Sequence, residues 1–306
     1  MNYSIAAVER DTGLSKDVLR VWERRYGFPA PARDAHGERV YPADQVERLR
    51  LIKRLMDQGH RPGKLISAAP ESLTALPPRR PPRKPSKNES PAADDLEEML
   101  EMIRQHDAAA FQQALQQSLA RQGLLSFVQD TVAPLTSRVG QAWEQGNFEV
   151  FEEHLFTELT KRQLRQIISS LPVRRGGPRI LLTTVPDEKH VLGLLMAEAL
   201  LALDGADCIP LGTQMPLLDI ARAAGAYQAD VVALSFSSAF PSRQIPLLLQ
   251  QLKPILPPGT QLWAGGAGVA NMPATAGLEY LPSFEDARQA LTRCHQAIKS
   301  RSVSSP

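Results

Sequence analysis

The chain has 306 residues and a formal net charge of +2, which gives room for two or three domains but no overall charge favouring nucleic acid. Its two cysteines, Cys208 and Cys294, lie far apart without metal-ligand spacing, so a disulfide scaffold is excluded and a reducing cytoplasm fits. The chain starts without a basic-then-apolar signal segment, and no apolar run approaches the roughly 20 residues that cross a bilayer. We therefore expect a cytoplasmic protein with no membrane partner.

The N-terminal residues predict two short helices separated by a tight turn. Ser4 and Gly13 are suited to begin and end the first helix, and Ser15 is suited to cap the second. The second helix carries arginines on its polar side, and we expect Trp22 to pack in the core rather than against DNA. Two helices in this order are typical of a helix-turn-helix.

A hairpin and a long helix are expected next. Residues 33–41, R-D-A-H-G-E-R-V-Y, predict a hairpin that turns at His36-Gly37. Pro42 then opens an amphipathic helix that is expected to end at Gly59, and a last short helix is expected around Leu65.

The runs L-R-V-W-E-R-R-Y-G-F-P, R-x5-R-V-Y and L-x-x-I-K-x-L-x-x-x-G resemble the winged helix-turn-helix of the MerR family of transcription regulators. This resemblance, carried by residues 1–70, implies that the second helix enters the major groove of operator DNA while the hairpin grips the flanking backbone. Most contacts are expected to position the protein and a minority to read bases. The expected DNA contacts are Lys16, Arg20, Arg24, Arg25, Arg39 and Tyr41. A solvated basic helix face is the alternative.

Residues 71–93 are rich in proline and arginine and lack apolar material to fold around, which predicts a semi-rigid, exposed linker. Its basic residues could add nonspecific DNA affinity, although a solvated spacer accounts for them as well; they are Arg79, Arg80, Arg83, Lys84 and Lys87.

Residues 94–172 are compatible with helix almost throughout, and breaks near His106-Asp107, Gly123 and Gly146-Asn147 predict a bundle of about four helices. Within it, Trp143 is followed after nine residues by Glu153-His154. A flat apolar side chain can cover an organic ligand, while a carboxylate and an imidazole can meet its hydroxyls and nitrogens. Core packing of the tryptophan and a solvated Glu-His helix face are the alternative.

Residues 178–300 alternate between strands and helices, which predicts a parallel sheet with helices on both faces. The expected strands are Ile180–Thr184, Asp207–Leu211, Val231–Ser235, Gln261–Ala264 and a weak fifth at Glu279–Leu281. The expected helices are Leu192–Leu203, Leu217–Tyr227, Ile245–Leu252 and Phe284–Ala297.

The loop after the first of these strands holds Glu188, His190 and Gly193 as E-x-H-x-x-G. An α/β sheet presents ligands at this edge, outside the carboxyl ends of its strands. A loop histidine there can ligate a metal while the carboxylate holds its other ring nitrogen, and the glycine lets the backbone approach a bulky ligand. A histidine that merely caps the loop is the alternative. Residues at the ends of the next three strands share this edge, namely Gly212, Ser235, Gly265 and Gly266.

The loop motif and these strand ends resemble cobalamin-binding Rossmann-like domains, and with Trp143, Glu153 and His154 the whole resembles MerR photoregulators of the CarH and LitR type. The resemblance implies an N-terminal winged helix-turn-helix, a four-helix bundle and a C-terminal Rossmann-like parallel α/β domain. It implies adenosylcobalamin, or another cobalamin, as cofactor.

Each motif has an implied role in holding that cofactor. His190 would ligate cobalt from below, oriented by Glu188, and the bundle motif would line the upper face. Gly193, Gly212, Ser235, Gly265 and Gly266 would admit the nucleotide tail. Two positions depart from the family pattern: Ser237 replaces a common aliphatic residue, and Glu144 replaces the histidine that follows the tryptophan in light-sensing members.

These features predict a transcriptional repressor rather than an enzyme, with operator DNA as partner and light sensed through a change in oligomeric state. A homodimer or homotetramer is expected, and RNA polymerase at the promoter is a further possible partner. One alternative is a MerR-type regulator that is light-insensitive or has lost the cofactor, as in MlrA. A remote alternative is a corrinoid carrier subunit of a methyltransferase.

Overall fold

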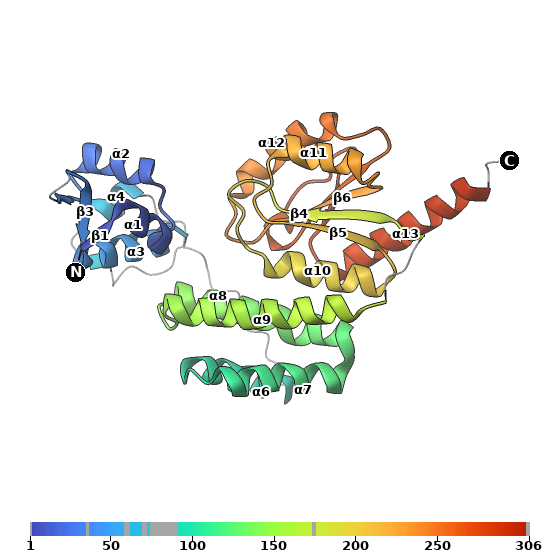
Figure 1. The fold of residues 1–306 in the computed structure, drawn as a ribbon, viewed down its shortest axis with the longest axis horizontal. Helices are drawn as coiled ribbons and strands as arrows, with labels where there is room; N and C mark the ends of the chain where they lie inside the picture. Colours follow the sequence, from blue (N-terminus) through green and yellow to red (C-terminus); the bar gives the residue numbers. More distant parts are fainter. Residues whose placement is uncertain are drawn as a thin grey trace. The chain divides into compact units, whose positions relative to one another are not determined.

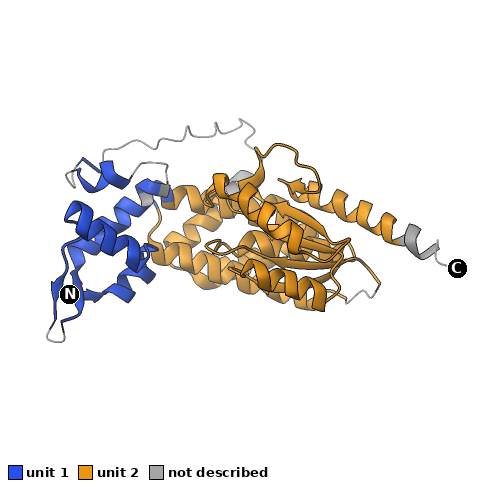
Figure 2. Cartoon of the chain, turned by 90° about the horizontal axis from the view of Figure 1, so that it is seen from above, with its two compact units in different colours: residues 1–88, 144–147 blue, residues 89–143, 148–306 orange. Residues whose placement is uncertain are grey.

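The computed structural model describes residues 2–34, 37–57, 62–68, 72–73, 91–172 and 176–303, which Figure 1 traces in colour. Residues 74–90, which hold most of the predicted linker and its five basic residues, lie outside these ranges, as do His36 and Gly59. The chain divides into two compact units, one of residues 1–88 with 144–147 and one of residues 89–143 with 148–306 (Figure 2).

The first unit is a winged helix-turn-helix, as predicted. Its three strands form an antiparallel sheet in the order β1-β3-β2. The strands are β1 (Asn2–Ser4), β2 (Ala32–Arg33) and β3 (Arg39–Pro42), and the helices are α1 (Ile5–Thr12), α2 (Lys16–Tyr26), α3 (Ala43–Asp57) and α4 (Pro62–Ile66). Strands β2 and β3 are the expected hairpin, whereas β1 was not predicted.

Side-chain caps and a small core explain why α1 and α2 form here. The Ser4 and Ser15 hydroxyls each accept a backbone N–H of the following first turn, at 3.3 Å in both cases. Leu19 and Leu49 are fully buried, and Trp22 is only 6% exposed, which confirms that the tryptophan packs in the core.

The second unit begins with the predicted bundle of four helices: α6 (Pro91–Arg104), α7 (Ala108–Ser126), α8 (Ala133–Glu144) and α9 (Val150–Ser170). The break predicted at Gly123 is a kink within α7, where this residue has φ 76°, and a π-helical segment, Phe127–Val132, leads on to α8. The other two breaks are loops, as expected.

The second unit continues as a five-stranded parallel sheet in the order β5-β4-β6-β7-β8. Its strands are β4 (Arg179–Thr183), β5 (Asp207–Gly212), β6 (Val231–Ser235), β7 (Gln261–Gly265) and β8 (Glu279–Leu281). Helices α10 (Leu192–Leu203) and α13 (Phe284–Val303) cover one face, and α11 (Leu217–Ala226) and α12 (Ile245–Leu252) cover the other (Figure 1). The order reverses between β4 and β6, so the switch point that favours ligand binding lies there.

Helix α10 joins the sheet to the bundle. Its Leu192, Leu195 and Met196 belong to the same buried cluster as bundle residues such as Phe156 and Leu164. Burial of one such side chain contributes about 1.5–3 kcal/mol, so this shared core makes the bundle and the sheet one body.

Chain direction places the start of α9 toward the ligand edge of the sheet. Helix α9 ends at Ser170, and a short connection leads to β4, which starts at the amino edge. Helix α9 lies along α10, which runs back from the carboxyl edge (Figure 1). The first turns of α9 therefore lie toward the carboxyl edge. Among the described residues, no helix is long and apolar enough to span a membrane.

Candidate functional site

The predicted metal-ligand loop contains a hydrogen-bonded group of three side chains, Glu188, His190 and Ser237. Glu188 Oε1 lies 2.7 Å from His190 Nδ1 and accepts the His190 backbone N–H at 3.0 Å. Glu188 Oε2 accepts the Ser237 backbone N–H at 2.8 Å and its hydroxyl at 2.9 Å. The Ser237 hydroxyl also lies 3.0 Å from His190 Nδ1. One carboxylate thus ties together the loops that follow β4 and β6.

Glu188 and His190 differ sharply in exposure. Glu188 is 1% exposed, whereas the His190 side chain is 62% exposed. Burial alone would raise the pKa of Glu188, but the hydrogen bonds from His190 and Ser237 outweigh it and lower that pKa. A charged carboxylate beside Nδ1 favours a proton on that nitrogen, so Nε2 carries the lone pair that a metal would use.

Thr184, which directly follows β4, holds the loop that carries His190. The Thr184 hydroxyl donates to the Glu188 carbonyl oxygen at 2.6 Å and accepts the Gln214 backbone N–H at 2.8 Å. Asp187 has φ 70°, which turns the chain sharply before Glu188. These contacts hold the loop at the switch point between β4 and β6, as expected for a ligand-binding edge.

The predicted tail residues, which are glycines and a serine at this edge, lie in closely packed surroundings. A Cβ on Gly193 would lie 3.2 Å from the Ser235 hydroxyl oxygen, so the absence of a side chain opens the space between them. Gly266 has φ 97°, and a Cβ there would lie 2.5 Å from the Phe236 carbonyl oxygen. The Gly212 carbonyl accepts the Thr183 hydroxyl at 2.9 Å, and Gly265 pairs with Leu281 in the sheet. At Gly265 and Gly266 the missing side chain is thus required by the protein's own packing, and only the space between Gly193 and Ser235 is left for a ligand group.

Of the bundle residues of the predicted upper face, Glu153 and His154 contact each other, and Trp143 packs half-buried against the bundle core. His154 Nδ1 lies 2.8 Å from Glu153 Oε2, and Glu153 Oε1 accepts the Thr157 hydroxyl at 2.8 Å. Because the His154 side chain is 74% exposed, its ring can meet a ligand. Here too a carboxylate thus pairs with an exposed histidine, and both pairs lie toward the carboxyl edge of the sheet.

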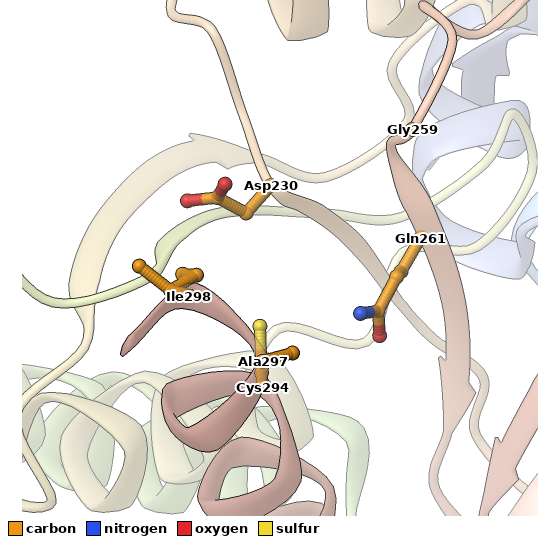
Figure 3. A pocket seen from close by; sticks show the side chains of 6 residues that line it. All are labelled: Asp230, Gly259, Gln261, Cys294, Ala297 and Ile298. Atoms are coloured by element: carbon orange, nitrogen blue, oxygen red, sulfur yellow. The ribbon is translucent and has the colours of Figure 1, made fainter. Parts of the chain in front are cut away.

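A small cavity lies at the opposite, amino edge of the sheet (Figure 3). It measures about 20 Å³ and is lined by Asp230, Gln261 and Cys294 among others. That volume holds about one water molecule, so the cavity is not a cofactor site. Among the described residues there is also no cluster of three or more His, Cys, Asp or Glu that could hold a metal.

Some of the predicted DNA-contacting side chains are exposed, and others are buried or paired with a side chain of the same domain. Arg20, Arg24 and Arg25 are exposed on α2, and Lys16 is half-buried, with its ammonium 3.6 Å from Glu9. Tyr41 is fully buried, so its side chain packs in the core and the expectation of a DNA contact is wrong for it in this fold. Arg39 is turned toward Glu23 of α2.

The comparisons with known proteins agree with this division of the chain. The family described as "MerR HTH family regulatory protein" matches residues 3–66, and two families described as "B12 binding domain" match residues 95–168 and 178–292. The chain is 30% identical over 270 residues to the HTH-type transcriptional repressor CarH of Myxococcus xanthus, covering 88% of this chain and 90% of CarH. It is also 30% identical over 241 residues to the repressor CarA of that organism, covering 78% of each chain.

A solved structure supports the fold of the second unit. The monomethylamine corrinoid protein of Methanosarcina barkeri matches with a TM-score of 0.52 at 14% identity, covering 66% of this chain and 99% of that protein. At this identity the match shows the architecture of bundle and parallel sheet alone.

Proposed function

Because the chain belongs to the family of MerR-type, cobalamin-binding transcriptional regulators that includes CarH and CarA, we propose that it is a repressor controlled by adenosylcobalamin. Its named relatives are repressors rather than enzymes, and no step of the proposed function requires turnover of a substrate. The proposal concerns the form of the corrinoid, the ligand of cobalt and the signal.

The observation that carries the proposal is the group formed by Glu188, His190 and Ser237. His190 would hold cobalt through Nε2, and Glu188 orients the ring because it engages Nδ1. The position at the switch point supports this assignment, since ligands of open parallel sheets bind there. The space beside Gly193 and Ser235 admits the nucleotide tail, with Gly212, Gly265 and Gly266 at the neighbouring strand ends.

We assign the first turns of α9 and the end of α8 to the upper face of the cofactor. When bound, adenosylcobalamin supplies a cobalt–carbon bond that light breaks. Trp143 covers the adenosyl group, and Glu153 and His154 offer oxygen and nitrogen atoms to its hydroxyls and base. Their placement toward the carboxyl edge supports this role. Glu144, which ends α8, cannot supply the imidazole nitrogen that a histidine would offer there.

Control of DNA binding follows from assembly. Winged-helix regulators read two half-sites as dimers, so any change in oligomeric state changes operator affinity. Residues of the bundle and of the sheet domain would both hold the cofactor, and the two parts share one buried core through α10. We assign Arg20, Arg24, Arg25 and Lys16 to the DNA, and release of the operator gives RNA polymerase access to the promoter.

The test uses the purified full chain mixed with adenosylcobalamin in the dark and then desalted. The absorption spectrum and the elution volume on size exclusion are recorded before and after illumination. The wild-type chain is expected to retain the corrinoid and to change both readouts in light. His190→Ala is expected to lose the corrinoid, whereas His295→Ala, the same change on α13, is the matched control and retains it.

Two results would contradict the proposal. Retention by His190→Ala equal to that of the control would remove the cobalt-ligand assignment. Retention without a light response would remove the photoregulator and favour a sensor of corrinoid supply or redox state, a second candidate that Glu144 already favours.

A further inference from the structure

One predicted DNA contact is held in an ion pair that joins two elements of the winged domain. The Arg39 guanidinium on β3 donates through Nε to Glu23 Oε2 at 2.8 Å and through a terminal nitrogen to Glu23 Oε1 at 3.4 Å. Glu23 belongs to α2, the helix with the exposed arginines. This two-point geometry fixes both the distance and the angle between the partners.

The pair is partly shielded, which strengthens it relative to a surface pair. Both side chains are 30% exposed. The hydrogen bond and the charge of Glu23 raise the pKa of Arg39 further above its already high ordinary value. Surface ion pairs contribute little, but bidentate geometry and partial burial are the conditions under which a pair holds two elements together.

The buried neighbour on the same strand supports a structural role. Residues two apart on a strand point to the same side, and Tyr41 belongs to the same buried cluster as Leu19 and Trp22 of α2. Tyr41 is fully buried, and within the described part of the chain its hydroxyl has no hydrogen-bond partner. The contact between β3 and α2 is therefore a core contact at Tyr41 with an ion pair at its rim.

We propose that Glu23 and Arg39 form a clamp that sets the angle of α2 against the β2–β3 wing, so that Arg39 is a positioning residue and not a phosphate contact. The inference rests on the proposed DNA-binding role of α2. In the clamp the negative charge of Glu23 is offset by the guanidinium of Arg39. Arg20 differs, since its side chain is 54% exposed and its ion pair is with Asp17 of the same helix, at 3.4 Å, so it does not join α2 to the wing.

The test measures binding of the full chain to the duplex that wild type selects from a random-sequence library, at several salt concentrations. Each lost phosphate contact lowers the slope of log affinity against log salt by about 0.9. Arg39→Gln is expected to weaken binding about tenfold without changing this slope, whereas the control Arg20→Gln lowers the slope. Arg39→Lys keeps the positive charge but cannot make the two-point contact with Glu23, so it is also expected to weaken DNA binding.

Glu23→Gln separates the two roles of Arg39 most sharply. A clamp predicts weaker binding, because the wing is no longer fixed. A phosphate contact predicts tighter binding, because a negative charge is removed and Arg39 is released toward DNA. Circular dichroism melts show whether each variant is folded, and the exchanged pair Glu23→Arg with Arg39→Glu is expected to recover most of the affinity.

Tighter binding by Glu23→Gln, or a lower salt slope in Arg39→Gln with full binding by Arg39→Lys, would overturn the clamp alone. Failure of the wild-type chain to select any duplex would overturn the proposed function and the clamp with it. The two failures are therefore distinguishable in one experiment.

Discussion

Replacing Ser237 by alanine is expected to weaken binding of adenosylcobalamin about tenfold, because the hydroxyl helps to orient the cobalt ligand. Glu188 accepts four hydrogen bonds, two from His190 and two from Ser237. Ser237→Ala keeps the backbone donor and removes the hydroxyl at 2.9 Å. A hydrogen bond to a charged group contributes about 1.5–3 kcal/mol, and the lower end applies because three of the four bonds remain.

Glu188→Gln is expected to have the larger effect, about 100-fold. The amide replaces one carboxylate oxygen by a donor, so either the His190 pair or the Ser237 pair of donors then faces another donor. The amide also lacks the charge that favours the proton on His190 Nδ1. Both variants retain the ligand itself, so they test orientation rather than ligation.

The assay is titration of the full chain with adenosylcobalamin in the dark, followed by absorption of the bound fraction. Ser238→Ala, at the exposed neighbouring position, is the matched control and should bind like wild type. The position of the absorption bands reports whether the histidine still ligates cobalt. If Ser237 only supported the fold, its replacement would not move the bands. Wild-type affinity and bands in Glu188→Gln would refute the reasoning, since no orienting contact would then matter.

Three further predictions concern stability and are measured by urea unfolding. Tyr41→Phe is expected to leave stability unchanged or raise it, because the buried hydroxyl has no partner; a large loss would mean that the hydroxyl is bonded. Gly266→Ala should cost about 1–3 kcal/mol, because φ 97° and the Phe236 carbonyl exclude a Cβ, whereas Gly265→Ala should cost less. Burial raises the pKa of Glu198, so the contribution of this side chain to folding stability is fully present below the ordinary glutamate pKa and is lost as pH rises through the raised value. The Glu198→Gln variant should therefore be more stable than wild type at about pH 8 and should lose this advantage at about pH 4.

Elements with strong periodicity were predictable because the local pattern determines them. The strand Val231–Ser235 and the helices Leu192–Leu203 and Ile245–Leu252 agree with the expectation at both ends. The strand Asn2–Ser4 was missed because three residues carry no alternation and the strand exists only through pairing with β3. The π-helical segment Phe127–Val132 was missed for a similar reason: its extra residue per turn leaves no mark on an apolar pattern.

From the sequence, positions for the candidate site could be proposed, but the contacts between them could not. The motif placed Glu188 beside His190, and their hydrogen bond follows from a spacing of two residues. Ser237 was treated as a departure because the family often has an aliphatic residue there, and its contact with Glu188 was not predicted because it spans 49 residues. The available signal was topological: Ser237 follows the strand adjacent to β4 across the switch point. Tyr41 was misassigned because its place on the wing strand does not reveal which side of the strand faces the core.

The structure suggests how the state of the ligand site can reach the rest of the second unit. Helix α10 starts two residues after His190 and is buried on two sides. Its Leu192 and Leu195 pack in the core shared with the bundle, while Leu194 and Leu201 pack against the sheet. Because protein interiors are close-packed, a shift of the histidine loop cannot be absorbed inside α10 and must change its packing on one side. On one side α10 packs along α9 of the bundle, and on the other it packs against the sheet and α13. A change at His190 would therefore reach both sides of α10, and the bundle side holds Trp143, Glu153 and His154, which we propose meet the same ligand.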